Sequence, residues 1–436
     1  MSSGVHIEKS APSAARFAFF PLIFVLTLVV IASLQTVFLG DSLASRLATV
    51  YALAHDGTWR IDRPSDQPPN PFDTLSVDKC EIGGRRLSTK PPVFPFLMTA
   101  EYMFLHKTLG WSLERHEDWK KIIQVMTLTF ITTTYFLGLV FFARLLGLFM
   151  IPSWRSFALF SAFAMGTQFF GYAANMNNHV PATAFLLACL YFGLGLATGQ
   201  LEPRPWRFFA FGMAAALTFT FDLPSTVFPA LVGLYLLYRF PKATLLWGGL
   251  GAFPWLALHF TLMTMITGSW VPIQTSRTYY LYEASVWRNP IGVDAMNEPK
   301  WLYLFHLTFG RHGSFLLFPV LTLGLLAFLR AVFLRKEPHR GLILGGMVAF
   351  VTLSAYYVLH TANYGGAAYG FRWHIATMPV LLLASAPWAE RMRPIRFWPP
   401  FAVLMSVSMY SAWECLHMPW SASQEWTCRW IFGAGY

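Results

Sequence analysis

The chain has 436 residues, of which 55% are hydrophobic and 12% are charged. A soluble domain usually carries about 25% charged residues, so this composition excludes a soluble enzyme and a disordered protein. The formal net charge of +11 does not indicate a nucleic-acid partner, because the charges are distributed as membrane topology requires. The composition predicts an all-α polytopic membrane protein.

Apolar runs long enough to cross about 30 Å of hydrocarbon alternate with short polar breaks. We predict about eleven transmembrane helices from these runs. Their ranges are 17–39, 122–148, 156–174, 182–198, 207–220, 226–238, 243–266, 314–334, 341–360, 373–388 and 398–416. The first run is longer than the roughly 7–15-residue core of a cleavable signal, so we expect a retained anchor.

Lys and Arg residues are concentrated in every second polar break. One set of breaks holds fifteen of them against four Glu residues, whereas the other set has no net charge. Because positively charged loops stay in the cytoplasm, we expect residues 1–16 to be a cytoplasmic N-terminus and residues 417–436 a short tail on the outer side. Residues 17–416 form the transmembrane domain between them.

The outer side carries two long loops, 41–121 and 267–313, while the cytoplasmic connections are short. Loops of this length usually carry function, so we expect the active site on this side. Cys80, Cys415 and Cys428 also lie there, in an oxidising compartment. A Cys415–Cys428 disulfide is the simplest of the pairings that the sequence leaves open.

Asp41 follows the first span and precedes an apolar stripe. Leu43, Leu47, Val50 and Leu53 share one helical face, which predicts a helix lying in the membrane interface. Asp41 has two compatible interpretations. It can be the N-cap of this helix, a general base held near the lipid headgroups, or both.

A group of cations follows in the same loop, next to Asp78. Its four members within twelve residues are Lys79, Arg85, Arg86 and Lys90. Gly83 and Gly84 predict a hairpin turn, and residues 93–110 predict a helix half-sunk in the outer leaflet. The cations are a solvated or lipid-contacting face, or they form a clamp for a lipid phosphate.

Polar residues at the ends of several later spans face the same side. They are Asn178 and His179, Asp222, and the group Tyr364, Arg372 and His374. Ionisable groups at membrane depth are functional by default, with helix caps and loop packing as the alternative. Arg372 is suited to a bidentate phosphate contact.

The second long loop is rich in aromatic residues, including Tyr279. Such residues are typical of a membrane-interface belt, and they also suit packing against sugar rings. His306 and His312 follow, but two histidines without further ligands are weak support for a metal site. We therefore predict no metal ligand set and leave a divalent cation open as a cofactor.

Several motifs in combination resemble bacterial polytopic glycosyltransferases of the GT-C superfamily. They are Asp41 with Ser45-Arg46-Leu-Ala-Thr, Asp78-Lys79, Ser88-Thr-Lys90-Pro-Pro, Asn178-His179, the stretch from His306 to His312, and the stretch from Tyr364 to Arg372. The family includes protein O-mannosyltransferases and the lipid A aminoarabinose transferase. The resemblance implies a large first periplasmic loop carrying an acidic catalytic residue, to which Asp41 corresponds. The chain lacks the Asp-Glu doublet common in the mannosyltransferases.

The resemblance also implies a bacterial inner-membrane enzyme. It would move a sugar from a polyprenyl-phosphate donor to a hydroxyl of a glycan, lipid or protein, usually with inversion. Asp41 is then the expected base, and the expected phosphate ligands are Arg46, Lys79, Lys90 and Arg372. The expected sugar and acceptor contacts are Asp78, Asn178, His179, Asp222, Tyr279, His306, His312, Tyr364 and His374.

Two hypotheses compete with the enzyme, namely a transporter or flippase of lipid-linked sugars and a non-catalytic protein of envelope assembly. A transporter is expected to have inverted repeats and a binding site near the membrane midplane. Here the polar groups crowd one side of the predicted membrane, which favours the enzyme.

Overall fold

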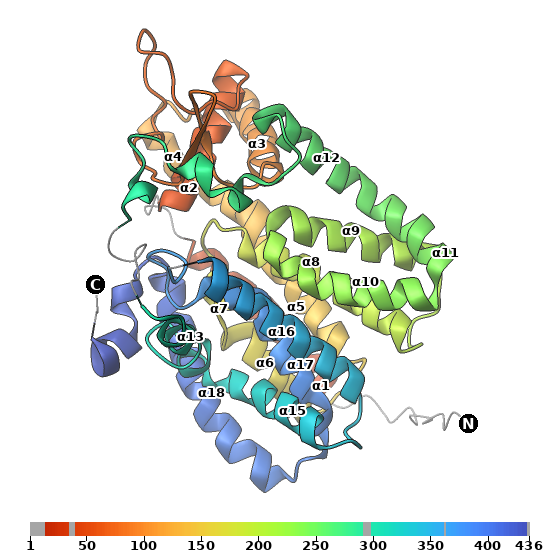
Figure 1. Cartoon of the computed structure of the whole chain (residues 1–436). Helices are drawn as coiled ribbons and strands as arrows, with labels where there is room; N and C mark the ends of the chain where they lie inside the picture. The colour runs from red at the N-terminus through yellow and green to blue at the C-terminus, as the bar shows by residue number, and fades with distance from the viewer. Residues whose placement is uncertain (1–13, 35–39, 291–297, 362, 434–436) are drawn as a thin grey trace.

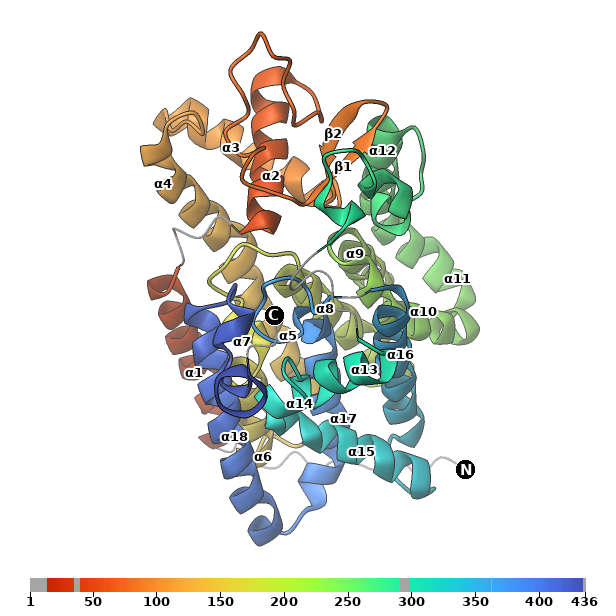
Figure 2. The ribbon, with the colours of Figure 1, turned by 60° about the vertical axis from the view of Figure 1, so that its left-hand side comes forward.

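The chain forms a helical bundle with a smaller cap at one end (Figures 1 and 2). The computed structural model describes residues 14–34, 40–290, 298–361 and 363–433. The cap combines the segments 41–115 and 268–290, which lie far apart in the sequence. The two predicted long loops therefore meet at the same end of the bundle.

The cap has helical segments and one hairpin. Its elements are α2 (Asp41–Tyr51), η1 (Ala52–Asp56), β1 (Lys79–Ile82), β2 (Arg85–Ser88), α3 (Val93–Leu109), η5 (Ile273–Thr275), η6 (Arg277–Tyr280) and η7 (Val286–Arg288). The strands are antiparallel, with Lys79 opposite Ser88. Gly83 and Gly84 turn the chain at φ +59° and +71°, a conformation that glycine adopts without strain. The predicted hairpin is confirmed.

The prediction that α2 lies in the membrane interface is wrong. Its residues from Ser42 to Tyr51 are all buried, on every side of the helix. Protein surrounds α2 because α3, η1 and strand β2 of the hairpin pack against it, and Arg46 contacts Asn178 of the bundle. In contrast, α3 exposes Phe96, Met103 and Phe104, as expected for a helix half-sunk in lipid.

Helical segments, from single turns to long helices, build the bundle. They are α1 (Ala14–Ala32), α4 (His116–Thr127) continued by η2 (Leu128–Thr132) and α5 (Thr133–Leu146), α6 (Trp154–Met165), α7 (Gln168–Gly171), α8 (His179–Ala197), α9 (Pro205–Phe221), η3 (Leu223–Thr226), α10 (Val227–Arg239), α11 (Pro241–Ala243), η4 (Thr244–Gly248) and α12 (Gly249–Thr267). The second half adds α13 (Lys300–Thr308), α14 (Ser314–Leu317), η9 (Pro319–Leu321), α15 (Thr322–Phe333), α16 (Arg340–His360), η10 (Arg372–Thr377), α17 (Met378–Arg391), α18 (Pro394–His417), η11 (Ala422–Gln424) and η12 (Cys428–Phe432).

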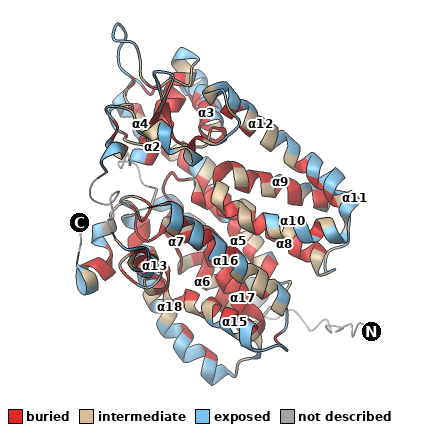
Figure 3. Cartoon of the chain, viewed as in Figure 1, coloured by how far each residue is buried: buried red, intermediate tan, exposed pale blue. Residues whose placement is uncertain are grey.

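Each of the eleven predicted spans overlaps one of these helical stretches. Within the described residues, four helices are long and apolar enough to cross a membrane, judged by length and composition, and they cover His116–Leu146, His179–Ala197, Pro241–Thr267 and Arg340–His360. The others are shorter or less apolar, so the count of eleven spans stays a prediction. α8 lies in the centre of the bundle, whereas α12 and α18 present exposed faces at its edge (Figure 3). Those faces are apolar, with Phe253, Met265 and Val403 exposed, which suits contact with lipid.

Connections that the charge pattern assigns to the cytoplasm contact one another. Arg155, near the start of α6, donates to the carbonyls of Glu390 and Met392 at 2.7 and 2.6 Å. The carboxylate of Glu337 binds both Arg330 and Arg391. Breaks that the sequence grouped on one side are therefore grouped in space.

The predicted Cys415–Cys428 disulfide is absent, and all four cysteines are free thiols. Cys415 packs beside Gly171 of α7, while Cys428 lies beside His312 and Glu425. The last turns of the chain direct the two side chains to different partners.

Candidate active site

Arg46 is the centre of a polar cluster where the cap meets the bundle. Its side chain is buried, with the residue 1% exposed. The guanidinium Nη1 donates to the Ser42 carbonyl and hydroxyl at 2.9 and 2.8 Å, and Nη2 donates to Asn178 Oδ1 at 2.7 Å. It also lies 5.4 Å from the centre of the Phe94 ring. The Nε atom is buried and has no hydrogen-bond partner among the described residues.

Lys90 and Asp78 form an ion pair beside Arg46. Lys90 Nζ is 2.6 Å from Asp78 Oδ2. The two residues flank the hairpin, and the hydroxyl of Ser45 on α2 fixes its base by contacting the Asp78 carbonyl at 2.7 Å and the Ser88 hydroxyl at 2.6 Å. Strand pairing brings Asp78 and Ser88 together, and Ser45 holds both of them next to α2.

Arg372 approaches the same place from the other half of the chain. Its guanidinium lies 5.0 Å from the centre of the Trp420 ring, and its Nε is buried with no hydrogen-bond partner in the described part of the chain. Gly365 makes room for it. This glycine has φ +95°, and a Cβ atom there would come within 3.2 Å of Arg372 Cγ and 3.3 Å of Nε.

We call Arg46, Asp78, Lys90 and Arg372 the charged cluster. Burial, together with the positive charge of Arg372, lowers the pKa of Arg46 to about 9 even though Asp78 opposes the shift. Burial favours a raised pKa for Asp78, but the charges of Lys90, Arg372 and Arg46 outweigh it and hold that pKa below its usual value. Burial also lowers the pKa of Lys90, against the opposing effect of Asp78. Three cations therefore act on the single carboxylate of this cluster, which leaves the cluster with an excess of positive charge.

Asn178, His179 and Asp222 lie directly beneath the charged cluster. Asn178 accepts from Arg46 and donates to the Phe221 carbonyl at 3.0 Å. His179 Nδ1 is 3.7 Å from Asp222 Oδ2, which also accepts from the Ser225 hydroxyl. Both His179 and Asp222 are buried. The helix ends that the sequence singled out thus form the floor of the site.

Asp41 is not the N-cap of α2, because Gly40 occupies that position without a side-chain hydrogen bond. Asp41 is the first helical residue and is exposed. Its Oδ1 accepts from the Val77 N–H at 3.1 Å, and its carbonyl accepts from the Ser76 hydroxyl at 2.7 Å. Asp41 therefore joins the start of α2 to residues 76 and 77, which immediately precede Asp78 of the charged cluster.

Lys79 is not part of the charged cluster, contrary to the prediction. Its Nζ contacts the carbonyl and Oδ1 of Asp73 at 2.7 and 2.9 Å. Neighbouring residues of an extended segment point to opposite sides, so Lys79 points away where Asp78 points in. Tyr279 is also apart, since it packs beside the hairpin near Cys80.

His374 lies inside the bundle and does not reach the charged cluster. Its two ring nitrogens are each 3.1 Å from a serine hydroxyl, Nδ1 from Ser314 and Nε2 from Ser354. This histidine is fully buried and both of its ring nitrogens have partners, so it stabilises the interior of the bundle. Predicting a site contact at this position from its closeness to Arg372 was wrong, because the 3₁₀ turn η10 directs the two side chains differently.

A second polar group contains three predicted residues, His306, His312 and Tyr364. The Tyr364 hydroxyl donates to Glu298, whose carboxylate is also 4.0 Å from His306 Nε2. His312 Nδ1 is 2.9 Å from Glu425 Oε1, and both residues are fully buried. The sequence analysis missed Glu298 and Glu425, because each is an isolated acid that only the folding of distant segments brings to a histidine.

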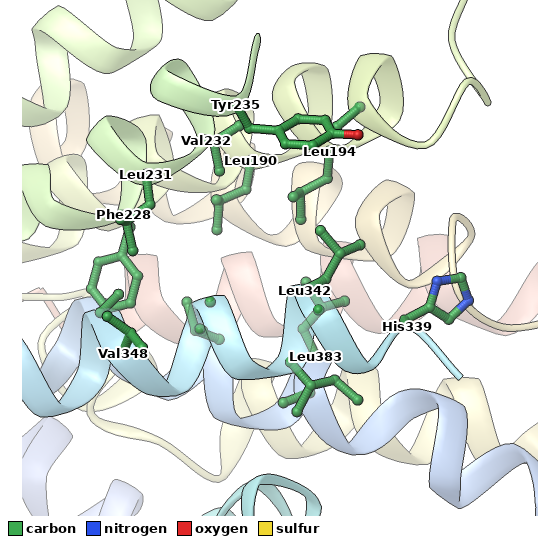
Figure 4. Close-up of a pocket in the computed structure, with 18 of the residues that line it drawn as sticks. Leu190, Leu194, Phe228, Leu231, Val232, Tyr235, His339, Leu342, Val348 and Leu383 are labelled. Carbon is green, nitrogen blue, oxygen red and sulfur yellow. The ribbon is translucent and has the colours of Figure 1, made fainter. Parts of the chain in front are cut away.

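An apolar cavity of about 360 Å³ lies between α8, α10, α16 and α17. Leucine, valine and phenylalanine side chains line it, and Figure 4 shows Tyr235 and His339 at one end of it, away from Phe228 and Val348. Phe228 belongs to the first turn of α10, which follows the segment carrying Asp222. One end of the cavity is therefore lined by the first turn of the helix that follows Asp222.

No family model matches the chain, and no curated protein matches its sequence. Among solved structures, the chain is similar to the crystal structure of ArnT from Cupriavidus metallidurans bound to undecaprenyl phosphate. The TM-score is 0.51 at 13% sequence identity, and the match covers 91% of this chain and 64% of that chain. The chain thus spans somewhat less than two thirds of the length of that protein.

Proposed function

We propose that the chain, whose fold is similar to that of ArnT, is a GT-C-like glycosyltransferase that transfers a sugar from a polyprenyl-phosphate donor to an acceptor hydroxyl. The reaction is assigned to the periplasmic face of the bacterial inner membrane. The observation that carries the proposal is the charged cluster, where the buried Arg46 and the partly buried Lys90 and Arg372 act on one carboxylate, Asp78. A phosphate group would neutralise this excess and give the buried Nε atoms of Arg46 and Arg372 an acceptor.

The proposed reaction is a single displacement. The bond between the anomeric carbon and the phosphate oxygen breaks, and the acceptor oxygen bonds to the anomeric carbon from the opposite face, which inverts it. The acceptor proton passes to the carboxylate of Asp41. The polyprenyl phosphate leaves with added negative charge, which Arg46, Lys90 and Arg372 stabilise.

The proposed base and the proposed phosphate ligands can each accelerate sugar transfer by a large factor. General base catalysis accelerates a reaction by roughly 10²–10⁴-fold. Stabilising charge that develops in a site shielded from water contributes about as much. The exposure of Asp41 supports its role as base, since an acceptor hydroxyl must reach it, whereas the burial of Arg46 suits a group that stays in place.

Other residues near the charged cluster suit the sugar and the prenyl chain of the proposed donor. Asn178, His179 and Asp222 offer hydrogen-bond partners for sugar hydroxyls below the phosphate. The apolar cavity between α10 and α16 supports a binding place for part of the prenyl chain, because its lining is almost entirely hydrocarbon. The ArnT structure was determined with undecaprenyl phosphate bound, and we propose the same class of lipid here.

Comparing a strain that lacks the gene with its parent tests the proposal. Mass spectrometry of envelope lipids, glycans and proteins is expected to find one sugar missing from one acceptor, restored by the parental gene and not by the Arg372→Ala variant. Envelopes of identical composition would contradict the enzyme. Purified protein in nanodiscs, supplied with lipid extract from the deletion strain, separates transfer from transport, because a flippase forms no covalent product.

A further inference from the structure

A compact group of metal-ligating side chains lies outside the charged cluster. It consists of His312, Glu425 and Cys428, which we call the tail cluster. Taking one ligand atom from each residue, the three atoms lie within 4.8 Å of one another, and all three residues are buried. His312 follows α13, whereas Glu425 and Cys428 belong to the C-terminal tail. We propose that the tail cluster binds a zinc ion, which fastens the tail to the rest of the periplasmic face.

The chemistry of the three side chains suits zinc better than the other common divalent ions. Imidazole, thiolate and carboxylate are all ligands of Zn²⁺, while a thiolate disfavours Mg²⁺ and Ca²⁺. One thiolate and one carboxylate carry two negative charges, which the ion neutralises inside the protein. His312 remains neutral as a ligand, and a water molecule can complete a tetrahedron.

The spacing of the ligand atoms is close to that of a zinc site. Bonds of about 2.0–2.3 Å in a tetrahedron separate ligand atoms by roughly 3.3–3.8 Å. In the tail cluster His312 Nδ1 is 2.9 Å from Glu425 Oε1, and the largest separation is within 4.8 Å. Shifts of about 1 Å or less would bring the three atoms to that geometry.

Further contacts hold these ligands in place, as is usual around metal sites. The Gly370 N–H donates to Glu425 Oε1 at 2.7 Å, and the Phe371 N–H donates to the His312 carbonyl at 3.1 Å. The Thr427 hydroxyl donates to the Arg311 carbonyl. The tail cluster therefore joins three segments of the chain at a single point.

One of those segments carries Arg372. Gly370 and Phe371, which contact the tail cluster, immediately precede it in the chain. A zinc ion here would keep this segment fixed against the tail without touching the donor. Its role is structural, and it is independent of whether the charged cluster binds a phosphate.

Metal analysis of the full-length protein tests this inference. Protein purified without chelator, then incubated with one equivalent of Zn²⁺ and desalted, is expected to retain about one zinc ion per chain. Cys428→Ser is expected to bind zinc at least tenfold more weakly. Cys189→Ser is the matched control, since Cys189 is a buried thiol in a separate core around α8, and it should keep the parental affinity.

Cobalt gives a second measurement, which reports directly on the metal–thiolate bond. Replacing zinc by Co²⁺ in the parental protein is expected to produce the near-ultraviolet absorption band of a cobalt–thiolate bond, which Cys428→Ser loses and Cys189→Ser keeps. A parental protein that retains no zinc and shows no such band would overturn the inference. Equal zinc affinity in the parent and in Cys428→Ser would overturn it as well.

Discussion

Arg46 of the cap donates a hydrogen bond of 2.7 Å to Asn178 of the bundle, across 132 residues of sequence. Asn178 stands immediately before α8, the central helix, and Arg46 lies in the middle of α2. This bond links the two parts of the molecule at the charged cluster. It also holds in place the guanidinium of Arg46, which is one of the proposed phosphate ligands.

Asn178→Ala should destabilise the protein, because it leaves a buried guanidinium nitrogen without its acceptor. We expect a loss of about 1–3 kcal/mol in the free energy of unfolding, measured by denaturant titration in detergent. Combining it with Arg46→Met should cost clearly less than the sum of the two single changes, since each removes the same interaction. Additive losses would contradict the link.

Arg372→Ala and Lys90→Ala should weaken binding of undecaprenyl phosphate. A lost charge-assisted contact costs about 1.5–3 kcal/mol, or roughly 10–150-fold in affinity. Native mass spectrometry or calorimetry in nanodiscs measures the change. Lys79→Ala is the matched control. Lys79 lies in the hairpin that precedes Lys90, but it pairs with Asp73. Unchanged affinity in both cluster variants would exclude the phosphate site.

Gly365→Ala and Gly366→Ala separate backbone strain from the position of Arg372. Both glycines have positive φ, so each alanine should destabilise the protein by about 1–3 kcal/mol. Only at Gly365 would the new Cβ press on Arg372. We therefore expect weaker undecaprenyl phosphate binding in Gly365→Ala alone, and equal binding by the two variants would argue against this role of Gly365.

Asp41→Asn should preserve folding and abolish most activity. Asn can still accept from the Val77 N–H, and Gly40 rather than Asp41 caps the helix. It cannot accept a proton at neutral pH, so the rate of sugar transfer should fall by ~10²-fold or more while donor binding stays near the parental value.

Asp73→Asn is the control for Asp41→Asn, because Asp73 is a cap acid that pairs with Lys79 away from the charged cluster. It should transfer sugar at close to the parental rate. If purified Asp41→Asn does so too, the base lies elsewhere, and Asp78 or Asp222 is the next residue to test.

Alkaline phosphatase fused after Tyr436 should be active, because eleven spans that start in the cytoplasm end in the periplasm. A fusion within the connection 334–339, between α15 and α16, should be inactive, since this connection belongs to the positively charged set. The reverse pattern would mean that the orientation is wrong, and activity at neither site would mean that the span count is off by one.

The sequence by itself determined the features that depend on local chemistry. Hydropathy located the helical stretches, since a backbone in lipid must satisfy its own hydrogen bonds. The glycine pair predicted the hairpin, because only positive φ closes that turn. Lys90 and Arg372 were singled out as cations expected at membrane depth, and Arg46 by the family resemblance, while their role as phosphate ligands stays a prediction.

Only the tertiary structure decided what depends on contacts between distant segments. An apolar stripe placed α2 at a surface, but packing from several directions buried it completely. Lys79 and Asp78 are neighbours in sequence, yet the extended backbone sends them to opposite sides. Glu425 contacts His312, which lies 113 residues away in the sequence. Side-chain direction and long-range pairing follow from how the whole chain packs, and no short stretch of sequence carries that information.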